Sequence, residues 1–407
     1  MSSPWAVLFG GPSPEHEISI LTGLQAERVL TAAGHAVTPI YWSPSGEWFH
    51  VPAGTEAKDY LDGVPKGAKA IEVRLSGDSG LFVKKRELQI EAVLLCLHGG
   101  VGEGGGAAAL FSLLGIPATG SSLFAGAVGM DKLAFGGLME VSGIPSLRRE
   151  HLSQVVDPTF AGPYIVKPRF GGSSIGIEIV EDIATARAIA KASAHLRAGA
   201  VVEPYRPTLI DLNISFRTSP SLSVTAVEKP LRDAPDAGGA GAGNAGAAGA
   251  GAGNAAGAGG AAPAVAKSGL YSYAEKYLSG GAGSEAGLSS APREFPAVLP
   301  AGVAEKAVEF ATRVAEVTGL TGVVRVDLLL DEATSELYVN EVNSIPGAMS
   351  LYLWAPQVPA ATVLMDALVE ARDKRFALPA SGFGAGAALR AAGGIAGKLV
   401  GLDGPRG

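Results

Sequence analysis

The chain has 407 residues, which is enough for two to three domains of ordinary size with a large buried core. Its 32 lysines and arginines are outnumbered by 39 aspartates and glutamates, so the formal net charge is −7. These counts exclude a disordered, self-repelling chain and a basic surface for nucleic acid.

Several sequence features predict a cytoplasmic protein that does not enter a membrane. The first residues lack the basic region and apolar run of a secretory signal peptide. The single cysteine, Cys96, allows no disulfide within the chain and is typical of a reducing compartment. Two long uncharged stretches occur, at 104–130 and 237–262, but one contains proline and polar residues and the other is rich in glycine. Neither stretch predicts a membrane-spanning helix.

The first third of the chain alternates strand and helix signals. The expected elements are strands at 6–10, 37–41 and 92–97 and helices at 13–34 and 107–114. The first helix is expected to begin at Ser13-Pro14, a typical N-cap followed by proline at the first helical position. Strand, helix and strand in this order predict an open parallel α/β sheet, and we assign residues 1–125 to this domain.

The rest of the chain follows a different order, which predicts an α+β arrangement. The expected elements are a helix at 131–142, strands at 164–167 and 177–180, a helix at 182–197, strands at 200–205, 211–218 and 222–228, a helix at 303–318, strands at 322–330 and 336–342, and a helix at 359–374. We divide this part into a central subdomain, 126–208, and a C-terminal subdomain, 209–375. The latter contains an Ala/Gly-rich insert at 232–268 and a tyrosine-rich segment at 269–290, which is typical of a lid loop. A Gly/Ala-rich tail, 376–407, ends the chain.

Four polar residues are expected on one face of the last strand pair. If the hairpin pairs Asp327 with Glu341, then Arg325 faces Asn343, and side-chain alternation puts all four on the same face. The other face would hold Val326, Leu328, Tyr338 and Val342. Two carboxylates and an amide oxygen suit Mg²⁺ and leave room for phosphate oxygens. The alternative is a solvated polar face with a surface ion pair.

Three other positions carry candidate chemistry. Lys167 ends a strand directly before a glycine- and serine-rich loop, 171–176, where an ammonium and N–H donors can surround phosphates. An ordinary glycine hairpin is the alternative. His98 precedes a glycine-rich turn and, taken alone, is more typical of a core histidine. Glu15 is expected in the first turn of a helix, where the dipole favours carboxylates, and it suits a substrate ammonium better than a nucleotide.

Seven motifs follow one another along the chain. They lie at 8–19, 98–103, 130–132, 167–176, 274–278, 325–327 and 340–347. In this order they resemble the D-alanine–D-alanine ligases of the ATP-grasp superfamily, over roughly residues 5–230 and 270–355. The resemblance implies an ATP-grasp fold preceded by an open parallel, Rossmann-like N-terminal domain.

The resemblance also implies roles in catalysis and substrate binding. Glu15 would hold the ammonium of the first D-alanine, in a hydrogen-bonded set with Ser173 and Tyr277. Arg325 and the Gly347 N–H would form the oxyanion site. The remaining implied substrate-binding residues are His98, Ser350 and Leu351, the last two near the carboxylate of the second D-alanine.

A second set of residues is implied to bind ATP and metal. Lys132 and Lys167 would hold phosphates, and Lys276 would reach the γ-phosphate from the lid. Glu203 would lie where the adenine-binding hinge begins. The other implied ATP-binding residues are Ser174 and Asp211, the latter at the ribose. The implied ligands of Mg²⁺ or Mn²⁺, two ions in all, are Asp327, Glu341 and Asn343.

The implied reaction begins with phosphorylation of the first D-alanine's carboxylate by ATP. The amine of the second D-alanine attacks the acyl phosphate, and phosphate leaves from a tetrahedral intermediate. The dipeptide would feed peptidoglycan synthesis, and family members are usually homodimers. The sequence departs from the family pattern at Gly104, Ala108, Phe170 and Gly171. These departures keep two alternatives open, a related ligase with other amino-acid substrates and a catalytically silent nucleotide-binding homologue.

Overall fold

The computed structural model describes residues 5–75, 77–231, 292–374, 387–392 and 395. Residues up to Lys374 form one compact unit, and the residues after it form a second, in which α10 (Ala387–Ala391) is described. The predicted lid loop with Lys276 and Tyr277 and the Ala/Gly-rich insert lie outside the described residues. Both therefore remain predictions, as do the domain boundaries. None of the described helices is long and apolar enough to cross a membrane.

A seven-stranded sheet, in the order β6-β5-β4-β3-β2-β1-β7, forms the N-terminal part of the first unit. Its strands are β1 (Trp5–Gly10), β2 (Val37–Trp42), β3 (Trp48–His50), β4 (Lys69–Arg74), β5 (Gly80–Val83), β6 (Arg86–Glu87) and β7 (Val93–Leu95). β1 is parallel to β2 and β7, as predicted. The ribbon from β3 to β6 is antiparallel and was not predicted. The connection from β2 to β3 is too short for a crossover, so this part of the sheet pairs antiparallel.

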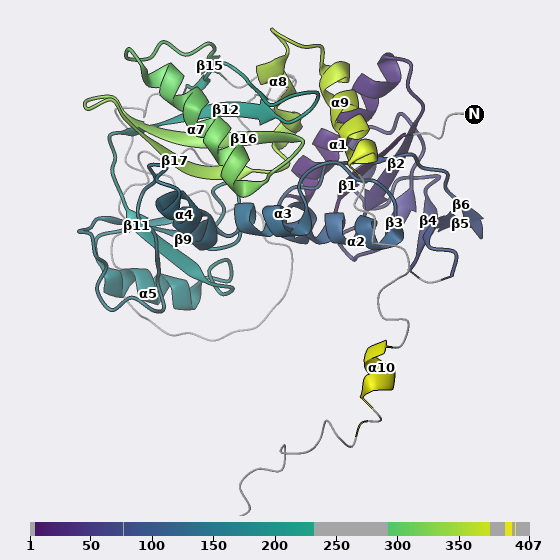
Figure 1. Ribbon diagram of the computed structural model, residues 1–407, viewed down its shortest axis with the longest axis horizontal. Helices are drawn as coiled ribbons and strands as arrows, with labels where there is room; N and C mark the ends of the chain where they lie inside the picture. The colour runs from purple at the N-terminus through teal and green to yellow at the C-terminus, as the bar shows by residue number, and fades with distance from the viewer. Residues whose placement is uncertain (1–4, 76, 232–291, 375–386, 393–394, 396–407) are drawn as a thin grey trace, which may run out of the picture. The chain divides into compact units, whose positions relative to one another are not determined.

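The helices on this sheet bring distant segments into one core. They are α1 (His16–Ala32), α2 (Ala107–Leu114) and α9 (Ala360–Asp373), with the short turns η1 (Ala57–Tyr60) and η2 (Gly102–Gly106). The next helix after α2, α3 (Leu123–Met130), buries Ala125 in a different core. α9 lies beside α1 (Figure 1) and buries Leu364 and Leu368 in the core that also contains Phe9. α1 approaches β1 closely because residue 23 is glycine, where a Cβ atom would lie 2.4 Å from the Cβ of Phe9.

The start of α1 differs from the prediction. Ser13 is not the N-cap: its hydroxyl accepts a hydrogen bond from the Glu15 N–H at 3.1 Å, within a turn that precedes the helix. Glu15 itself is the N-cap residue, and its side chain does not cap the helix. The carboxylate of Glu15 therefore takes its hydrogen bonds from outside the helix.

The central part of the chain forms a four-stranded sheet in the order β10-β9-β11-β8. Its elements are α4 (Lys132–Val141), β8 (Glu150–His151), β9 (Tyr164–Pro168), β10 (Glu178–Val180), α5 (Ile183–Ala192) and β11 (Ala200–Pro204). All the helices and strands predicted between 131 and 205 occur, and β8 is an addition. α5 covers one face of this sheet (Figure 1) and shares a small apolar core with it.

A second four-stranded sheet, in the order β13-β12-β16-β17, carries α7 across one face (Figure 1). The elements of this part are β12 (Leu209–Arg217), β13 (Ser223–Val224), β14 (Lys229–Pro230), β15 (Arg293–Glu294), α7 (Val303–Thr318), β16 (Val323–Asp331), β17 (Glu336–Asn343), η3 (Gly347–Ser350) and α8 (Leu351–Trp354). The apolar face of β16 packs on α7, which leaves the opposite face of the sheet for polar side chains.

The register of the β16–β17 hairpin confirms one prediction and corrects another. Asp327 pairs with Glu341 and Arg325 pairs with Asn343, as predicted. Directly beyond Asp327 a β-bulge inserts Asn340, so that the next pair is Leu328 with Val339. The bulge reverses the alternation, and Tyr338 lies on the polar face beside Leu329. The prediction that Tyr338 shares the apolar face with Val326 was therefore wrong.

Candidate active site

The polar face of the hairpin presents an oxygen-rich cluster. Arg325 donates two hydrogen bonds to Asp327, from Nε to Oδ1 at 2.6 Å and from Nη2 to Oδ2 at 2.9 Å. The amide of Asn343 donates to the same Oδ2 at 3.1 Å. Glu341 forms an ion pair with Lys132, at 3.2 Å between Oε2 and Nζ. A surface ion pair does not describe this cluster, because the Arg325 side chain is only 10% exposed and that of Asp327 14%.

This donor set fits a divalent cation. Two carboxylates and an amide on neighbouring strands supply hard oxygen ligands, the kind that Mg²⁺ accepts alongside phosphate oxygens. Within the described ranges, no three histidines, cysteines, aspartates or glutamates lie close enough together to hold a metal ion by themselves. The amide of Asn343 therefore has to complete the protein's part of the set. Arg325 and Lys132 balance the two negative charges.

Lys132 links the polar face of the β16–β17 hairpin to the glycine- and serine-rich loop. Its ammonium donates to the Gly171 carbonyl and pairs with Glu341, so it lies between the two segments. Asp131 caps α4 by accepting hydrogen bonds from the N–H groups of residues 133 and 134, which fixes Lys132 at the first helical position. Arg169 holds Asp131 in turn, with Nε 2.8 Å from Oδ1.

Lys167 lies at the end of β9 and points to a buried carboxylate. Its Nζ is 2.8 Å from Oε2 of Glu203 on β11 and 3.3 Å from Oδ1 of Asn340 in the bulge. Glu203 is fully buried, and its other oxygen accepts from Nε of Arg149 at 2.7 Å. Burial alone would raise the pKa of Glu203, yet the adjacent Arg149 and Lys167 hold the pKa below its ordinary value. Neither Arg149 nor Asn340 was predicted as a site residue.

Glu15 lies between two glycine turns. The hydroxyl of Ser173 donates to its Oε1, and both side chains are buried. Gly99 has a φ of +65°, and a Cβ atom there would lie 2.3 Å from Oε2 of Glu15. A side chain at position 99 would be strained by this φ and would displace the Glu15 carboxylate. Ser173 and Ser174 both have left-handed backbone conformations, with φ of 51° and 58°, so this loop stores strain to present their side chains.

His98 connects α1 to the turn before Gly347. Its Nδ1 donates to the Ile345 carbonyl at 2.8 Å, and Nε2 lies 2.8 Å from the hydroxyl of Thr22. Thr22 also accepts from the Ala348 N–H at 3.2 Å, which leaves its own proton for His98. Burial lowers the pKa of His98 to about 4, so the ring is neutral. Both ring nitrogens are satisfied within the protein, as expected for a histidine that positions the turn.

Glu103 performs a related function from the other side, and it was not predicted as a site residue. Its Oε2 accepts from the Gly99 N–H at 2.9 Å and its Oε1 accepts from the Ile345 N–H at 3.2 Å. The side chain thereby joins the turn at 98–100 to the turn at 344–347. Burial, together with the charge of Glu15, raises the pKa of Glu103 to about 7.

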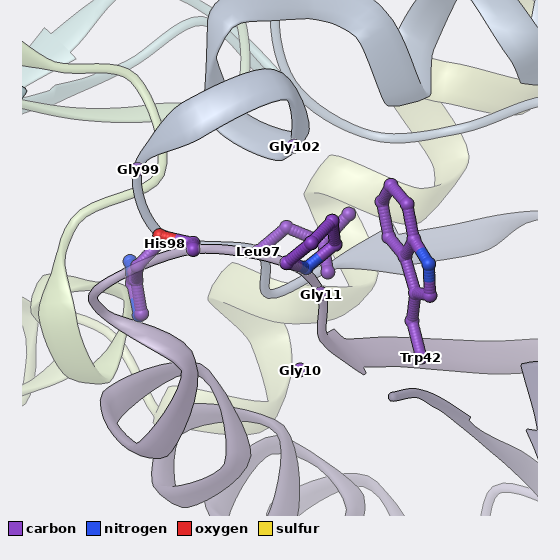
Figure 2. Close-up of a pocket in the computed structure, with 9 residues that line it drawn as sticks. Gly10, Gly11, Trp42, Leu97, His98, Gly99 and Gly102 are labelled. Carbon is purple, nitrogen blue, oxygen red and sulfur yellow. The ribbon is translucent and has the colours of Figure 1, made fainter. Parts of the chain in front are cut away.

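One pocket brings seven of the predicted site residues together. It is lined by Glu15, His98, Glu103, Ser173, Arg325, Glu341, Asn343, Ile345 and Gly347. Four of the five predicted catalytic residues are among these, and the fifth, Tyr277, lies outside the described residues. A second pocket shares His98 and is lined by Gly10, Gly11, Pro12, Ser13, Trp42, Leu97, Gly99 and Gly102. Figure 2 shows Leu97 between His98 and Trp42, with the imidazole directed away from the indole.

Eight of the predicted residues that the structure describes do not line that pocket: Lys132, Lys167, Ser174, Glu203, Asp211, Asp327, Ser350 and Leu351. Asp211 lies on the polar face of β12, paired with Leu329, two positions beyond the pair formed by Asn213 and Asp327. Leu351 is buried in the N-terminal core, and Ser350 is fully buried. Among the described residues no hydrogen-bond partner is found for the Ser350 hydroxyl. The structure therefore does not bring Ser350 and Leu351 to the pocket wall.

The opposite pKa shifts of His98 and Glu103 predict opposing effects on stability. The unfolded chain protonates His98 near its ordinary pKa of 6.5 and the folded chain only near 4, so His98 lowers stability as the pH falls through this window. Glu103 is protonated near 7 in the folded chain and near 4.5 when unfolded, so it raises stability as the pH falls. The two effects offset each other in the wild type.

Removing either group should expose the effect of the other. Between pH 7 and pH 5, Glu103→Gln is expected to lose about 2 kcal/mol of unfolding free energy relative to the wild type, and His98→Asn to gain about as much. Urea denaturation at the two pH values measures both changes. Variants that follow the wild-type pH profile would show that neither group is shifted in this way.

Comparisons with known proteins agree along most of the chain. The family model described as D-ala D-ala ligase N-terminus matches residues 5–121, and the one described as D-ala D-ala ligase C-terminus matches residues 251–371. A D-alanine–D-alanine ligase of Methylobacterium sp. (strain 4-46) is 30% identical, covering 89% of this chain and 90% of the relative. One from Thermosipho melanesiensis is 26% identical, covering 91% and 93%.

Solved structures show the same fold. The VanG D-Ala:D-Ser ligase of Enterococcus faecalis superposes with a TM-score of 0.68 at 21% identity, covering 91% of this chain and 100% of that one. The D-alanine–D-alanine ligase of Coxiella burnetii superposes with a TM-score of 0.67 at 19% identity, covering 92% and 95%.

Proposed function

The chain belongs to the D-alanine–D-alanine ligase family, and from this premise we propose that the pocket around Glu15 and Arg325 joins two D-alanines. The protein is an ATP-dependent carbon–nitrogen ligase with a role in cell-wall synthesis. One observation supports the site assignment above all. A single pocket is lined by a carboxylate suited to an ammonium, by two of the three proposed metal ligands and by Arg325 together with Gly347.

The first D-alanine is placed by Glu15 and Ser173. The buried carboxylate of Glu15 pairs with the ammonium, and the Ser173 hydroxyl keeps that carboxylate oriented. The substrate carboxylate then extends across the pocket towards Arg325 and Glu341, which line its other side. Tyr277, which the family resemblance adds to this set, is proposed to join it from the lid segment.

ATP is proposed to lie between the central and C-terminal sheets. Lys132 and Lys167 hold its phosphates, with Ser174 from the strained loop, and Lys276 reaches the γ-phosphate from the lid. Glu203 lies at the adenine end and Asp211 at the ribose. Lys132 contacts both the Gly171 carbonyl and Glu341. Its ammonium therefore lies between the glycine- and serine-rich loop and the proposed metal ligands.

A divalent metal is implied by the family, and we propose two Mg²⁺ or Mn²⁺ ions held by Asp327, Glu341 and Asn343. Such ions neutralise charge on the phosphoryl group that is transferred. Arg325 and the Gly347 N–H stabilise the oxyanion that forms when the second amine attacks, and each such donor contributes about 2.7–4 kcal/mol. We also propose that the protein is a cytoplasmic homodimer.

The test is phosphate release with ATP, Mg²⁺ and single D- or L-amino acids. We expect release with D-alanine and formation of D-alanyl-D-alanine, detected by mass spectrometry. Turnover with an L-amino acid pair but not with D-alanine would overturn the substrate assignment. An absence of turnover with every pair tried would point instead to a catalytically silent homologue.

A further inference from the structure

Arg149 is a buried arginine that contacts three separate segments. Its side chain is only 2% exposed. Nε donates to Oε1 of Glu203 at 2.7 Å, and Nη1 donates to the Lys132 carbonyl at 3.2 Å. Nη2 donates to the Asn340 carbonyl, and it also lies 3.3 Å from the Asn340 Oδ1. The guanidinium therefore connects β11, the start of α4 and the bulge of β17.

Glu203 is held by cations at both oxygens. Arg149 donates to Oε1, and Lys167 donates to Oε2 at 2.8 Å. The Glu203 side chain that they hold is fully buried. A buried carboxyl with no charged partner would become neutral and could then donate a hydrogen bond. Paired with two cations it stays ionised, and an ionised carboxylate only accepts hydrogen bonds.

We propose that Arg149 determines the nucleobase preference of this ligase by holding Glu203 as a fixed, acceptor-only carboxylate at the base end of the nucleotide site. This inference rests on the proposed placement of ATP beside Lys167 and Glu203. A purine with an amine at position 6, such as adenine, donates to that carboxylate. A purine with a carbonyl at the same position, such as hypoxanthine, places an acceptor against an acceptor. Arg149 acts through Glu203 and is a positioning residue, because it need not touch the base.

The helix next to Arg149 offers a matched pair of test positions. A Cβ atom at Gly136 would lie 3.0 Å from Cδ and 3.6 Å from Nη1 of Arg149, so alanine there would push the arginine aside by a few tenths of an ångström. A Cβ atom at Gly137 meets nothing within 4 Å. Both glycines lie inside α4, so the same substitution changes helix propensity equally and moves Arg149 in only one of the two variants.

The experiment measures binding of ATP and of ITP by calorimetry, with Mg²⁺ and without amino acids. The selectivity is the ratio of the two dissociation constants. We expect the wild type to favour ATP and Arg149→Met to lower the selectivity at least tenfold. Arg149→Lys should restore part of it, because the charge beside Glu203 is kept. Gly136→Ala should lower the selectivity several-fold and Gly137→Ala should leave it unchanged.

The outcomes separate the inference from the proposed function. A folded wild type that binds neither nucleotide would contradict the proposed function. A wild type that binds ATP and ITP equally, or an Arg149→Met variant with unchanged selectivity, would overturn the role of Arg149 alone. If Arg149→Met does not fold, the inference is tested by comparing the nucleotide selectivity of Gly136→Ala with that of Gly137→Ala. Equal selectivity in Gly136→Ala and Gly137→Ala would then refute the inference.

Discussion

Glu341→Gln is expected to reduce kcat of the ligase reaction at least a thousandfold, which corresponds to about 4 kcal/mol of lost transition-state stabilisation. The substitution removes one of the two negative charges proposed to hold the metal. It also breaks the ion pair with Lys132, 3.2 Å away, and so disturbs the lysine proposed to hold phosphate. Phosphate release under saturating ATP and D-alanine measures the loss, and raising the Mg²⁺ concentration should recover little of it.

Glu336→Gln is the matched control. Glu336 lies at the exposed end of the same strand and accepts a hydrogen bond from the Tyr338 hydroxyl at 2.6 Å, far from the pocket residues in the register of the hairpin. The chemical change is identical, so any general effect on β17 should appear in both variants. Near wild-type kcat in Glu341→Gln would refute the metal assignment.

The hairpin shows how far side-chain periodicity can predict a site. The pairing of Asp327 with Glu341 was the register assumed for the hairpin, and from it alternation put the charged groups on one face, as the structure shows. The alternation of side chains between the two faces is interrupted at Asn340, because the bulge adds one residue to β17. The apolar residues Val339 and Val342 both lie in the core although they are three positions apart, a spacing that a regular strand does not allow. That spacing is the sequence signal from which the bulge could have been found.

The residues that the sequence did not reveal are those whose partners are distant. Arg149 is 54 positions from Glu203 and 191 from Asn340, and nothing near it in the chain indicates that it is buried. Glu103 contacts Ile345 across 242 positions. Short motifs could identify His98, Lys167 and the 340–347 segment because each carries its signal locally. Tertiary contacts of single charged residues have no such signal.

Fold class was predictable for a different reason. The order of strands and helices indicated an open parallel α/β domain followed by an α+β part, the family resemblance implied that this part is an ATP-grasp fold, and the structural neighbours confirm the fold. The antiparallel ribbon from β3 to β6 was missed because its strands have only two to six residues and alternate weakly. The packing of α9 on the N-terminal core was also missed. The amphipathic pattern of a helix shows that one face is buried, but it does not show which sheet covers that face.

Arg325→Lys is expected to lower kcat a hundred- to a thousandfold while changing KM for ATP little. Arg325 makes two hydrogen bonds to Asp327, at 2.6 and 2.9 Å, and it is proposed to meet the oxyanion together with the Gly347 N–H. A lysine keeps the charge, but a single ammonium cannot hold Asp327 through two parallel bonds and also face the substrate. The expected loss, about 2.7–4 kcal/mol, is that of one oxyanion donor.

Arg217→Lys distinguishes this effect from the general cost of shortening a buried arginine. Arg217 lies on β12, pairs with Asp366 at 2.7 Å and is not among the residues that line the pocket. Its replacement should leave kcat near the wild-type value and affect mainly thermal stability. An equal fall of kcat in both variants would assign Arg325 to the packing of the sheet. A loss confined to KM for ATP would assign it to the nucleotide. Only a fall of kcat specific to Arg325→Lys, at unchanged KM for ATP, agrees with a donor that acts after ATP has bound.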